Sequence, residues 1–286
     1  MIDLIAAGWE GYELIDSGEG KRLERFGPHT VVRPDPNIIW VKSNPDNAAW
    51  STPDLEYLGK KEEPWKASAE IHQGWDVAYG KSRFLLKPTS FRHVGLFPEQ
   101  QAHWDWIEEK VKAAVKEGRK PKVLNLFAYT GASSVIAARA GAQVTHVDAS
   151  KASVYKAREN GVASGLAEDA IRWIVDDVLK FMLREVRRGN HYDMILMDPP
   201  VFGRGPKGEI WRIEVGITEL AVLTSQLLTE KPIGVLANVY ATALYPQAVL
   251  RVFEDALPTM KCELGCLSLK ETSSGKLLPT GYFVRA

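Results

Sequence analysis

Along most of the chain, short apolar runs alternate with longer stretches in which apolar residues recur every three or four positions. The first pattern is typical of buried strands and the second of amphipathic helices. From about residue 99 onward, this alternation predicts strands at 122–127, 143–148, 171–176, 192–197 and 233–240. It predicts helices at 104–116, 132–140, 151–164, 179–188, 214–229 and 246–257. Five consecutive strand–helix units indicate a parallel, doubly wound sheet with helices on both faces.

The C-terminal end departs from this alternation. Two strands are predicted at 262–270 and 282–285, and the turn-rich link between them, which contains Ser273-Ser274-Gly275, has no helix. Such a pair adds an antiparallel edge to the sheet, so we expect an α/β, Rossmann-like fold with seven strands. A plain dinucleotide-binding domain usually closes with a sixth parallel strand instead.

The first ninety residues read differently, as short β-prone runs separated by turns. A hairpin is predicted from 30–33 to 38–41 around the turn Pro34-Asp35-Pro36-Asn37, and a second from 76–79 to 83–86 around Gly80. The polar, proline-containing stretch 43–65 is expected to be loop. We therefore predict two domains, a small β-rich module at 1–92 and a larger α/β domain at 93–286.

Composition narrows the class of protein. The net charge is zero, which argues against a strongly basic nucleic-acid binder. We see neither a stretch of about 18 apolar residues nor a secretory signal, so we expect a cytoplasmic protein with no membrane partner. The two cysteines cannot form a disulfide framework, and the six histidines lack metal-ligand spacing, so no metal site is expected. The oligomeric state is left open.

In a doubly wound sheet, ligands bind beyond the carboxyl ends of the strands, so the residues there are the candidates for chemistry. The first strand runs into Phe127-Ala128-Tyr129-Thr130-Gly131, where Gly131 lets the backbone approach a ligand closely. One glycine is fewer than a dinucleotide's pyrophosphate usually requires. S-adenosylmethionine has no phosphate, so this loop favours that cofactor over NAD, although a tight turn without ligand would look the same.

The next two strands end in acidic residues. Asp148, followed by Ala149-Ser150, can accept hydrogen bonds from both hydroxyls of an adenosine ribose; it could instead cap the following helix, although Ser150 could do that. The third strand ends in Asp176-Asp177, and Asp177 either accepts from the adenine amino group or simply caps a helix.

The fourth strand ends in Asp198-Pro199-Pro200-Val201-Phe202. The two prolines fix φ and remove two backbone donors, which holds this turn in one conformation. Such stiffness suits a transfer reaction in which orientation alone can supply about 7–11 kcal/mol. Phe202 offers a ring on which a planar base could stack. A Pro-Pro loop with a core phenylalanine is the alternative interpretation.

Together these segments resemble the RlmI/RlmK-like group of large-subunit ribosomal RNA methyltransferases, from about Phe91 to the C-terminus. The resemblance is carried by Gly95-Leu96-Phe97-Pro98-Glu99-Gln100, Asn125-x-Phe127-x-Tyr129-Thr130-Gly131, Val147-Asp148-Ala149-Ser150, Ala157-Arg158-Glu159-Asn160 and Asp198-Pro199-Pro200-x-Phe202. It implies a class I methyltransferase fold, S-adenosylmethionine as cofactor and S-adenosylhomocysteine as product. It also implies that the cofactor pocket is lined by Gln100, Asn125, Phe127, Tyr129, Asp148, Ser150, Asp177 and Asp198. The adjoining Thr130, Gly131, Ala149 and Asp176 are further candidates for cofactor binding.

One departure concerns the acceptor atom. Members of the group that make 5-methylcytosine attack the base with a cysteine just after the fifth strand, where this chain has Ala237-Asn238-Val239-Tyr240-Ala241-Thr242. Cys262 and Cys266 lie four apart on the predicted penultimate strand and are expected in the core. A base nitrogen of RNA, with ribosomal RNA as the partner, is therefore the expected acceptor, and Asp198, Pro199, Pro200 and Phe202 are the candidate catalytic residues.

Three alternatives stay open from the sequence. The neutral charge suits a methyltransferase acting on a protein or a small molecule. A nucleotide-dependent oxidoreductase and a non-catalytic binding module of the same fold are more distant. Beside the site, the glycine-rich, basic segment 202–212 is interpreted as a flexible lid that grips the substrate, with an ordinary surface loop as the alternative.

Overall fold

The computed structural model describes residues 1–240 and 242–286, and these divide into two compact units. Unit 1 comprises Met1–Leu4, His103–Leu267 and Thr280–Ala286. Unit 2 comprises Ile5–Ala102 and Ser268–Pro279. The tip of the C-terminal hairpin thus belongs to unit 2 although its strands begin and end in unit 1. A start of the larger α/β domain at residue 93 remains our proposal.

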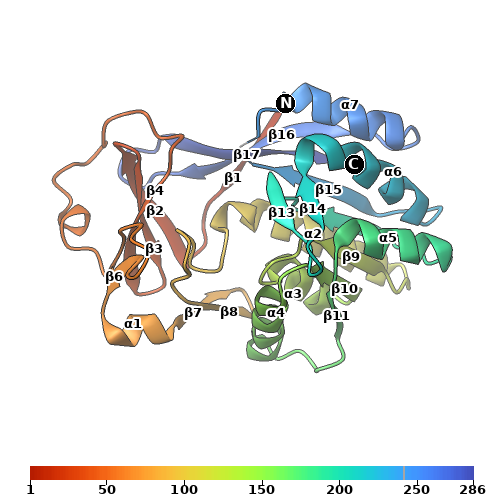
Figure 1. Cartoon of the computed structure of the whole chain (residues 1–286), viewed down its shortest axis with the longest axis horizontal. Coiled ribbons are helices and arrows are strands. Elements are labelled where there is room, and N and C mark those ends of the chain that lie inside the picture. Colours follow the sequence, from red (N-terminus) through yellow and green to blue (C-terminus); the bar gives the residue numbers. More distant parts are fainter. Residues whose placement is uncertain (241) are drawn as a thin grey trace. The chain divides into compact units, whose positions relative to one another are not determined.

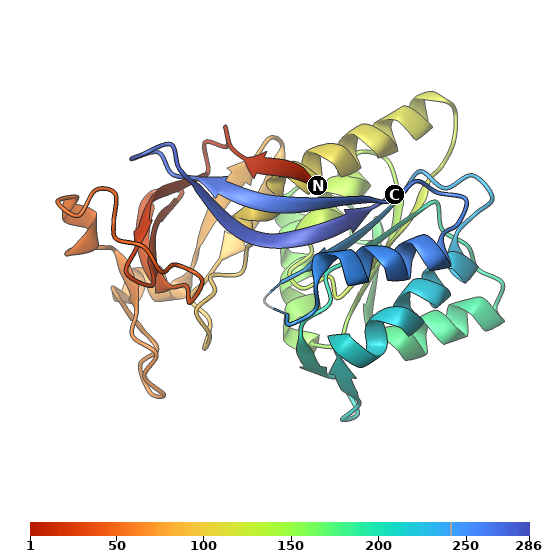
Figure 2. The same ribbon diagram turned by 90° about the horizontal axis from the view of Figure 1, so that it is seen from above.

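A mixed sheet of eight strands forms the centre of unit 1, in the order β1-β16-β17-β15-β12-β9-β10-β11. Its parallel strands are β9 (Lys122–Leu126), β10 (Gln143–Asp148), β11 (Ile171–Val175), β12 (Met194–Met197) and β15 (Gly234–Val239). The remaining strands are β16 (Glu263–Lys270), β17 (Leu277–Arg285) and β1 (Ile2–Ala6), and β17 is antiparallel to β15. The long strands β16 and β17 run beside each other in Figure 2. The predicted doubly wound sheet with its closing hairpin is confirmed.

The number of strands is a correction, since β1 adds an eighth strand at the edge, beside β16. The sequence pattern assigned these first residues to the N-terminal module. A short apolar run does not indicate a partner strand more than 250 residues away. Pairing at a sheet edge therefore depends on the tertiary structure.

Helices cover both faces of this sheet (Figure 1). One face carries α5 (Val178–Arg187), α6 (Ile213–Leu227) and α7 (Pro246–Ala256), whose apolar residues share a core with β9, β12 and β15. The other carries α3 (Ala132–Arg139) and α4 (Lys151–Ala163), and α2 (Gln101–Lys116) precedes β9. Each agrees with a predicted helix to within three residues. Among the described residues, no helix is long and apolar enough to cross a bilayer.

Unit 2 is β-rich, as predicted. Its five-stranded sheet has the order β2 (Tyr12–Gly18), β3 (Lys21–Phe26), β4 (His29–Pro34), β5 (Leu55–Tyr57), β6 (Trp65–Ala67). The second predicted hairpin is confirmed as β7 (Trp75–Tyr79) and β8 (Ser82–Leu86). The unit also contains η1 (Ala48–Trp50), α1 (Ala69–Gln73) and η2 (Pro98–Gln100).

The first predicted hairpin is wrong in its second strand. Residues 38–41 form no strand, and the side chains of Ile39 and Val41 are exposed. β4 instead pairs with β3 on one side and in parallel with β5 on the other. The segment 43–65, expected to be loop, supplies β5 as well as η1. Both edges of β4 are thereby occupied. The carbonyls of Ile38 and Trp40 instead accept from the amides of Gly20 and Glu19, at 3.0 and 2.7 Å.

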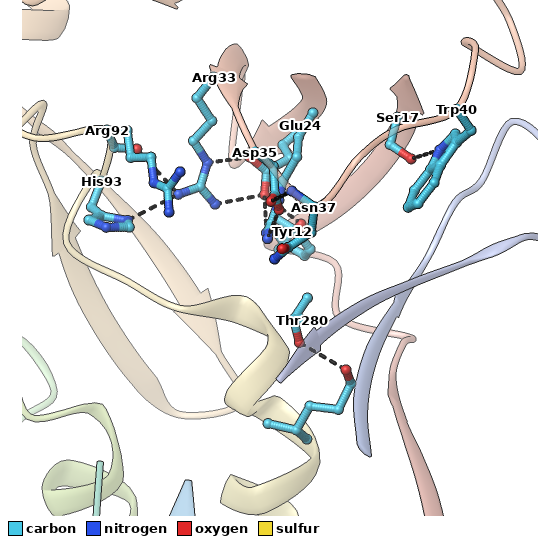
Figure 3. Close-up of polar contacts among 12 residues, drawn as sticks. Tyr12, Ser17, Glu24, Arg33, Asp35, Asn37, Trp40, Arg92, His93 and Thr280 are labelled. Atoms are coloured by element: carbon cyan, nitrogen blue, oxygen red, sulfur yellow. Dashed lines mark hydrogen bonds and ion pairs between the residues drawn. The ribbon is translucent and has the colours of Figure 1, made fainter. Parts of the chain in front are cut away.

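Buried charges hold the sheet of unit 2 together (Figure 3). Arg33 donates to both carboxylate oxygens of Glu24, at 2.5 and 2.8 Å, and the phenol of Tyr12 donates to Glu24 at 2.8 Å. On its other side, the Arg33 guanidinium contacts the carbonyl of Arg92 and the ring of His93, each at 3.4 Å. Burial of Glu24 opposes ionisation, but the Arg33 guanidinium outweighs it and lowers the pKa of Glu24. A buried, charge-assisted network of this kind depends on every partner being present.

Candidate functional site

The carboxyl ends of the central strands meet at one edge of the sheet. Val147 of β10 pairs with Leu126 of β9, and the amide of Asp198, just after β12, donates to the Leu126 carbonyl at 3.3 Å. On the other side, the amide of Asp176 donates to the carbonyl of Asp148 at 3.1 Å. These registers bring three of the predicted acidic residues to neighbouring positions along the edge.

The loop after β9 has an unusual backbone. Phe127 and Tyr129 have φ of 51° and 47°, and Gly131 has φ of 81°. Each non-glycine residue in this left-handed region costs about 1–3 kcal/mol, and such residues cluster at functional sites. An added Cβ at Gly131 would lie 2.8 Å from the Cβ of Ala157 in α4, so glycine is required here by both conformation and space. The loop is a shaped turn, held closely against α4.

Three amides of this loop are used inside the protein. Ala128 donates to the Val147 carbonyl at 3.1 Å, Tyr129 to the Asp148 carboxylate at 2.8 Å, and Gly131 to the Ala128 carbonyl at 2.9 Å. A dinucleotide's pyrophosphate needs such amides as donors. S-adenosylmethionine carries no phosphate, so the loop fits it better than NAD.

Asp148 is held at the edge by two main-chain amides. Its Oδ2 accepts from Tyr129 and its Oδ1 from Ser150, each at 2.8 Å. Burial raises the pKa of Asp148, and these two hydrogen bonds only partly oppose that. Each carboxylate oxygen has a second lone pair that the amides do not use. The two hydroxyls of a ribose can donate to these free lone pairs. The remaining acceptor positions of this carboxylate therefore fit the adenosine part of the cofactor.

The helix-capping alternative for Asp148 is settled by its neighbour. Ser150 is the N-cap of α4, and its hydroxyl accepts from the amide of Ser153 at 3.2 Å. Ala149 between them is partly exposed. Asp148 is thus not needed as a cap, and its carboxylate instead joins the loop after β9 to the start of α4.

Asp177 does act as a cap, the simpler of its two interpretations. Its carboxylate accepts from the amide of Lys180 at 3.0 Å at the start of α5. Asp176 accepts from the Asp177 amide at 2.9 Å and forms an ion pair with Arg184. A contact of either residue with the adenine remains a proposal.

Another predicted residue, Asn125, precedes the loop in β9. The Asn125 side chain is buried in the sheet and donates to the hydroxyl of Ser134 at 2.9 Å, which in turn contacts the ring of His146 at 3.0 Å. Burial lowers the pKa of His146 to about 3, so this ring is neutral. Asn125 therefore supports the loop rather than facing outward from it.

Thr130 is also buried, and its carbonyl accepts from the side-chain amide of Asn160 at 2.8 Å. Asn160 lies in α4, so this hydrogen bond ties the loop to that helix. Sequence reasoning assigned Asn160 to a motif but gave it no role. Its helical spacing from Val154 and Ala157, which places it on the buried face of the predicted helix, is the signal that could have suggested one.

The turn after β12 is tied to the following hairpin. The carbonyl of Pro200 accepts from the indole Nε1–H of Trp211 at 2.6 Å, and the Trp211 ring packs against Phe127 at 4.8 Å between centroids. Pro199 is buried, whereas Pro200 is exposed. Phe202 begins strand β13 (Phe202–Arg204), which pairs with β14 (Ile210–Arg212). The segment interpreted as a flexible lid contains a paired hairpin, so it is not the ordinary surface loop of the alternative interpretation. Trp211 is an anchor that sequence reasoning missed.

The remaining candidates belong to other elements of the chain. Gln100 is buried in η2 of unit 2. Cys266 lies in β16 and Cys262 just before it, both partly buried. Burial raises the pKa of Cys262, which opposes formation of the reactive thiolate. Of the segment 237–242, Ala241 lies outside the described residues.

Known proteins match this chain over most of its length. Residues 56–233 match the family of S-adenosylmethionine-dependent methyltransferases. The crystal structure of the SAM-dependent methyltransferase from Agrobacterium tumefaciens is 37% identical, with a TM-score of 0.94, over 100% of this chain and 93% of that one. The structure of SMU.776 complexed with S-adenosylhomocysteine has a TM-score of 0.70 at 18% identity, over 93% and 71% of the two chains, and shows likeness of fold.

Among curated relatives, ribosomal RNA large subunit methyltransferase I of Aeromonas salmonicida is 31% identical over 242 residues, which are 75% of this chain and 60% of that protein. The chain spans about half the length of the curated relatives it matches. Since the family match covers well over half of the chain, this protein belongs to the S-adenosylmethionine-dependent methyltransferases.

Proposed function

We propose that this protein methylates a base nitrogen of RNA, with large-subunit ribosomal RNA as the substrate class. The observation that carries the proposal is the turn Asp198-Pro199-Pro200-x-Phe202 at the edge of the sheet, beside the loop that fits the cofactor. The curated relatives named as ribosomal RNA methyltransferases support the same substrate class.

S-adenosylmethionine, when bound, supplies a methyl group activated by a positively charged sulfur. Asp148 would accept the ribose hydroxyls, and the shaped loop from Phe127 to Gly131 would hold the cofactor against the strand ends. The carboxylate of Asp198 is also suited to a cationic neighbour, since an opposite charge nearby stabilises both groups.

On the substrate side, the residues of the turn would orient the base. Phe202 is half exposed and can stack on a planar ring. An amino nitrogen loses one proton when it gains a methyl group, and Asp198 is the candidate to accept it. Because Trp211 occupies the Pro200 carbonyl, the Pro199 carbonyl is our candidate for orienting the amino hydrogens.

The positions of the two cysteines also support a nitrogen acceptor. Methylation at cytosine C5 needs a thiolate nucleophile, and segment 237–242 contains no cysteine. The raised pKa of Cys262 and its place beside β16 make it a poor substitute.

The test is incubation with radiolabelled S-adenosylmethionine and, separately, undermethylated ribosomal RNA, total protein and a metabolite extract. We expect label in RNA, released after nuclease digestion as an N-methylated nucleoside. Label confined to protein or metabolites would overturn the RNA substrate, and 5-methylcytosine would overturn the nitrogen acceptor. Asp198→Asn should lose turnover by about 10²-fold or more while keeping its fold. Full activity in this variant would remove the role given to Asp198.

A further inference from the structure

The β13–β14 hairpin has two different faces. Its register pairs Phe202 with Arg212, Gly203 with Trp211, and Arg204 with Ile210. Since side chains alternate along a strand, Gly203 and Trp211 share one face, and the other four residues share the opposite one. Burial agrees with this division, because Trp211 is buried and the other four are exposed. Figure 2 shows the tip of this hairpin extending away from the helices of unit 1.

The inner face holds the hairpin in place. Trp211 packs on Phe127 and donates to the Pro200 carbonyl, and its ring fills the space where a Cβ of Gly216 in α6 would lie, 2.4 Å away. The amide of Ile213 donates to the Val201 carbonyl at 3.0 Å. The outer face is therefore presented on a fixed support, next to the turn that carries Asp198.

The outer face combines apolar and cationic side chains. Phe202 is 51% exposed and Ile210 is 67% exposed. Within residues 1–240 and 242–286, neither Arg204 nor Arg212 has a side-chain hydrogen bond or an ion pair. The acidic residue of the hairpin, Glu209, is engaged by Lys180 at 2.7 Å and by the amide of Lys207 at 2.8 Å. Glu209 is thus already paired with groups other than the two arginines.

Arg212 stands where a cation is unfavourable for the fold. It is the N-cap of α6 and makes no capping hydrogen bond. The N-terminus of a helix carries a partial positive charge, so Ser, Thr, Asp or Asn would stabilise it more. A guanidinium at this position lowers helix stability, and an anionic ligand on the outer face would offset that cost.

We propose that Phe202, Arg204, Ile210 and Arg212 form a docking surface for single-stranded RNA; the inference rests on the proposed function. The two arginines lie on one diagonal of the hairpin, where Cβ atoms are about 7–8 Å apart, and Phe202 and Ile210 lie on the other. Arginines bind phosphates, while aromatic and apolar side chains contact the faces of unstacked bases. A duplex hides those faces, so a single-stranded segment is the form that uses all four side chains.

Fluorescence anisotropy with a fluorescein-labelled 15-nucleotide RNA of mixed sequence tests this surface, as a single strand and annealed to its complement. The variant Arg204→Gln/Arg212→Gln should weaken binding of the single strand at least tenfold. It should also reduce the slope of log affinity against log salt by about 1.4, the loss expected for two phosphate contacts. Ile210→Ala should weaken binding without changing that slope. The matched control is Arg187→Gln/Arg251→Gln, which removes two exposed arginines elsewhere in unit 1 and should bind like wild type.

The outcomes separate this inference from the proposed function. Unchanged single-strand affinity and unchanged KM for RNA in Arg204→Gln/Arg212→Gln would overturn the surface, even if wild type methylates RNA. Duplex binding as tight as single-strand binding would overturn the assignment to single strands. Absence of RNA methylation in wild type would instead count against the proposed function. S-adenosylmethionine affinity, measured by calorimetry, should be the same in all variants, and a loss of it in Arg204→Gln/Arg212→Gln would show that the hairpin serves cofactor binding instead.

Discussion

The indole of Trp211 donates a 2.6 Å hydrogen bond to the carbonyl oxygen of Pro200. This contact joins the turn that carries Asp198 to the β13–β14 hairpin. A proline turn lacks two amide donors of its own, so its position depends on what its carbonyls accept from. One side chain thereby couples the proposed catalytic turn to the proposed RNA surface.

Trp211→Phe should preserve the packing on Phe127 and remove the hydrogen bond. We expect turnover to fall between about tenfold and about 100-fold, because small misplacement at the reacting centre is costly. Single-turnover kinetics with saturating RNA would measure it. Trp65→Phe is the matched control, since it removes an indole hydrogen bond to the Thr89 carbonyl within unit 2. Equal turnover in wild type and Trp211→Phe would show that the turn does not need this contact.

Asp148→Asn should weaken S-adenosylmethionine binding about 10- to 150-fold, the range for losing a charged hydrogen-bond acceptor. Calorimetry on wild type and variant measures this. The cofactor needs the ionised carboxylate, so wild-type affinity should fall as pH decreases toward the raised pKa of Asp148. That loss should begin above the usual aspartate range near 3.9. A wild-type affinity constant across this range, or an unaffected variant, would count against the ribose contact.

The raised pKa of Asp148 has the opposite pH effect on the stability of the cofactor-free protein. Because folding raises the pKa of Asp148, the folded state holds this proton more tightly than the unfolded state. The contribution of Asp148 to the free energy of unfolding is therefore present at low pH and is lost as pH rises through the folded pKa. Asp148→Asn should remove this component from the pH profile of denaturant unfolding.

Gly131→Ala should destabilise the protein by about 1–3 kcal/mol, since it adds both left-handed strain and a clash with Ala157. It should also weaken cofactor binding, because the loop must move to relieve the clash. Gly189→Ala is the control, with φ of 66° and no atom within 4 Å of an added Cβ. Thermal unfolding and calorimetry compare the two. Equal loss of stability in both variants, with intact cofactor binding, would show that the clash with α4 is unimportant.

Removing one partner of the Glu24–Arg33 pair should cost about 3–5 kcal/mol of unfolding free energy, because a buried charge is left unpaired. Denaturant unfolding of Glu24→Gln measures this loss. The control is Glu13→Gln, which removes the partly exposed ion pair with Arg25 and should cost about 0–1 kcal/mol. Since folding lowers the pKa of Glu24, its contribution is present above the unfolded pKa near 4.3 and is lost as pH falls below it. A Glu24→Gln variant as stable as wild type at pH 7 would contradict the argument.

The strand–helix order and the acidic residues at strand ends were readable from the sequence, because both are local. A buried strand shows its apolar run, and the residue that follows it is read directly. Parallel strands then place Asp148, Asp176 and Asp198 on one edge without further information. Ser150 and Asp177 were readable as possible caps, since each precedes an amphipathic stretch, but the sequence left a second role for Asp177 open.

Long-range pairing was not readable. Residues 38–41 have the composition of a strand and were predicted to pair with β4. β4 instead pairs with β3 and with the later β5. The N-terminal residues pair beside β16 at the other end of the chain. A run of apolar residues predicts that the segment is buried or paired. Which strand it pairs with depends on the arrangement of the whole sheet.

The sequence by itself determined the fold class and the edge on which the chemistry lies, because periodicity and strand ends are properties of neighbouring residues. The cofactor followed from the family resemblance that the strand-end motifs carry. Only the tertiary structure decided what each side chain does there. In the folded protein, Asn125 donates to Ser134, Asp177 caps α5, and Trp211 donates to the Pro200 carbonyl. Those choices depend on distances between residues far apart in the chain, and only the packed structure sets them.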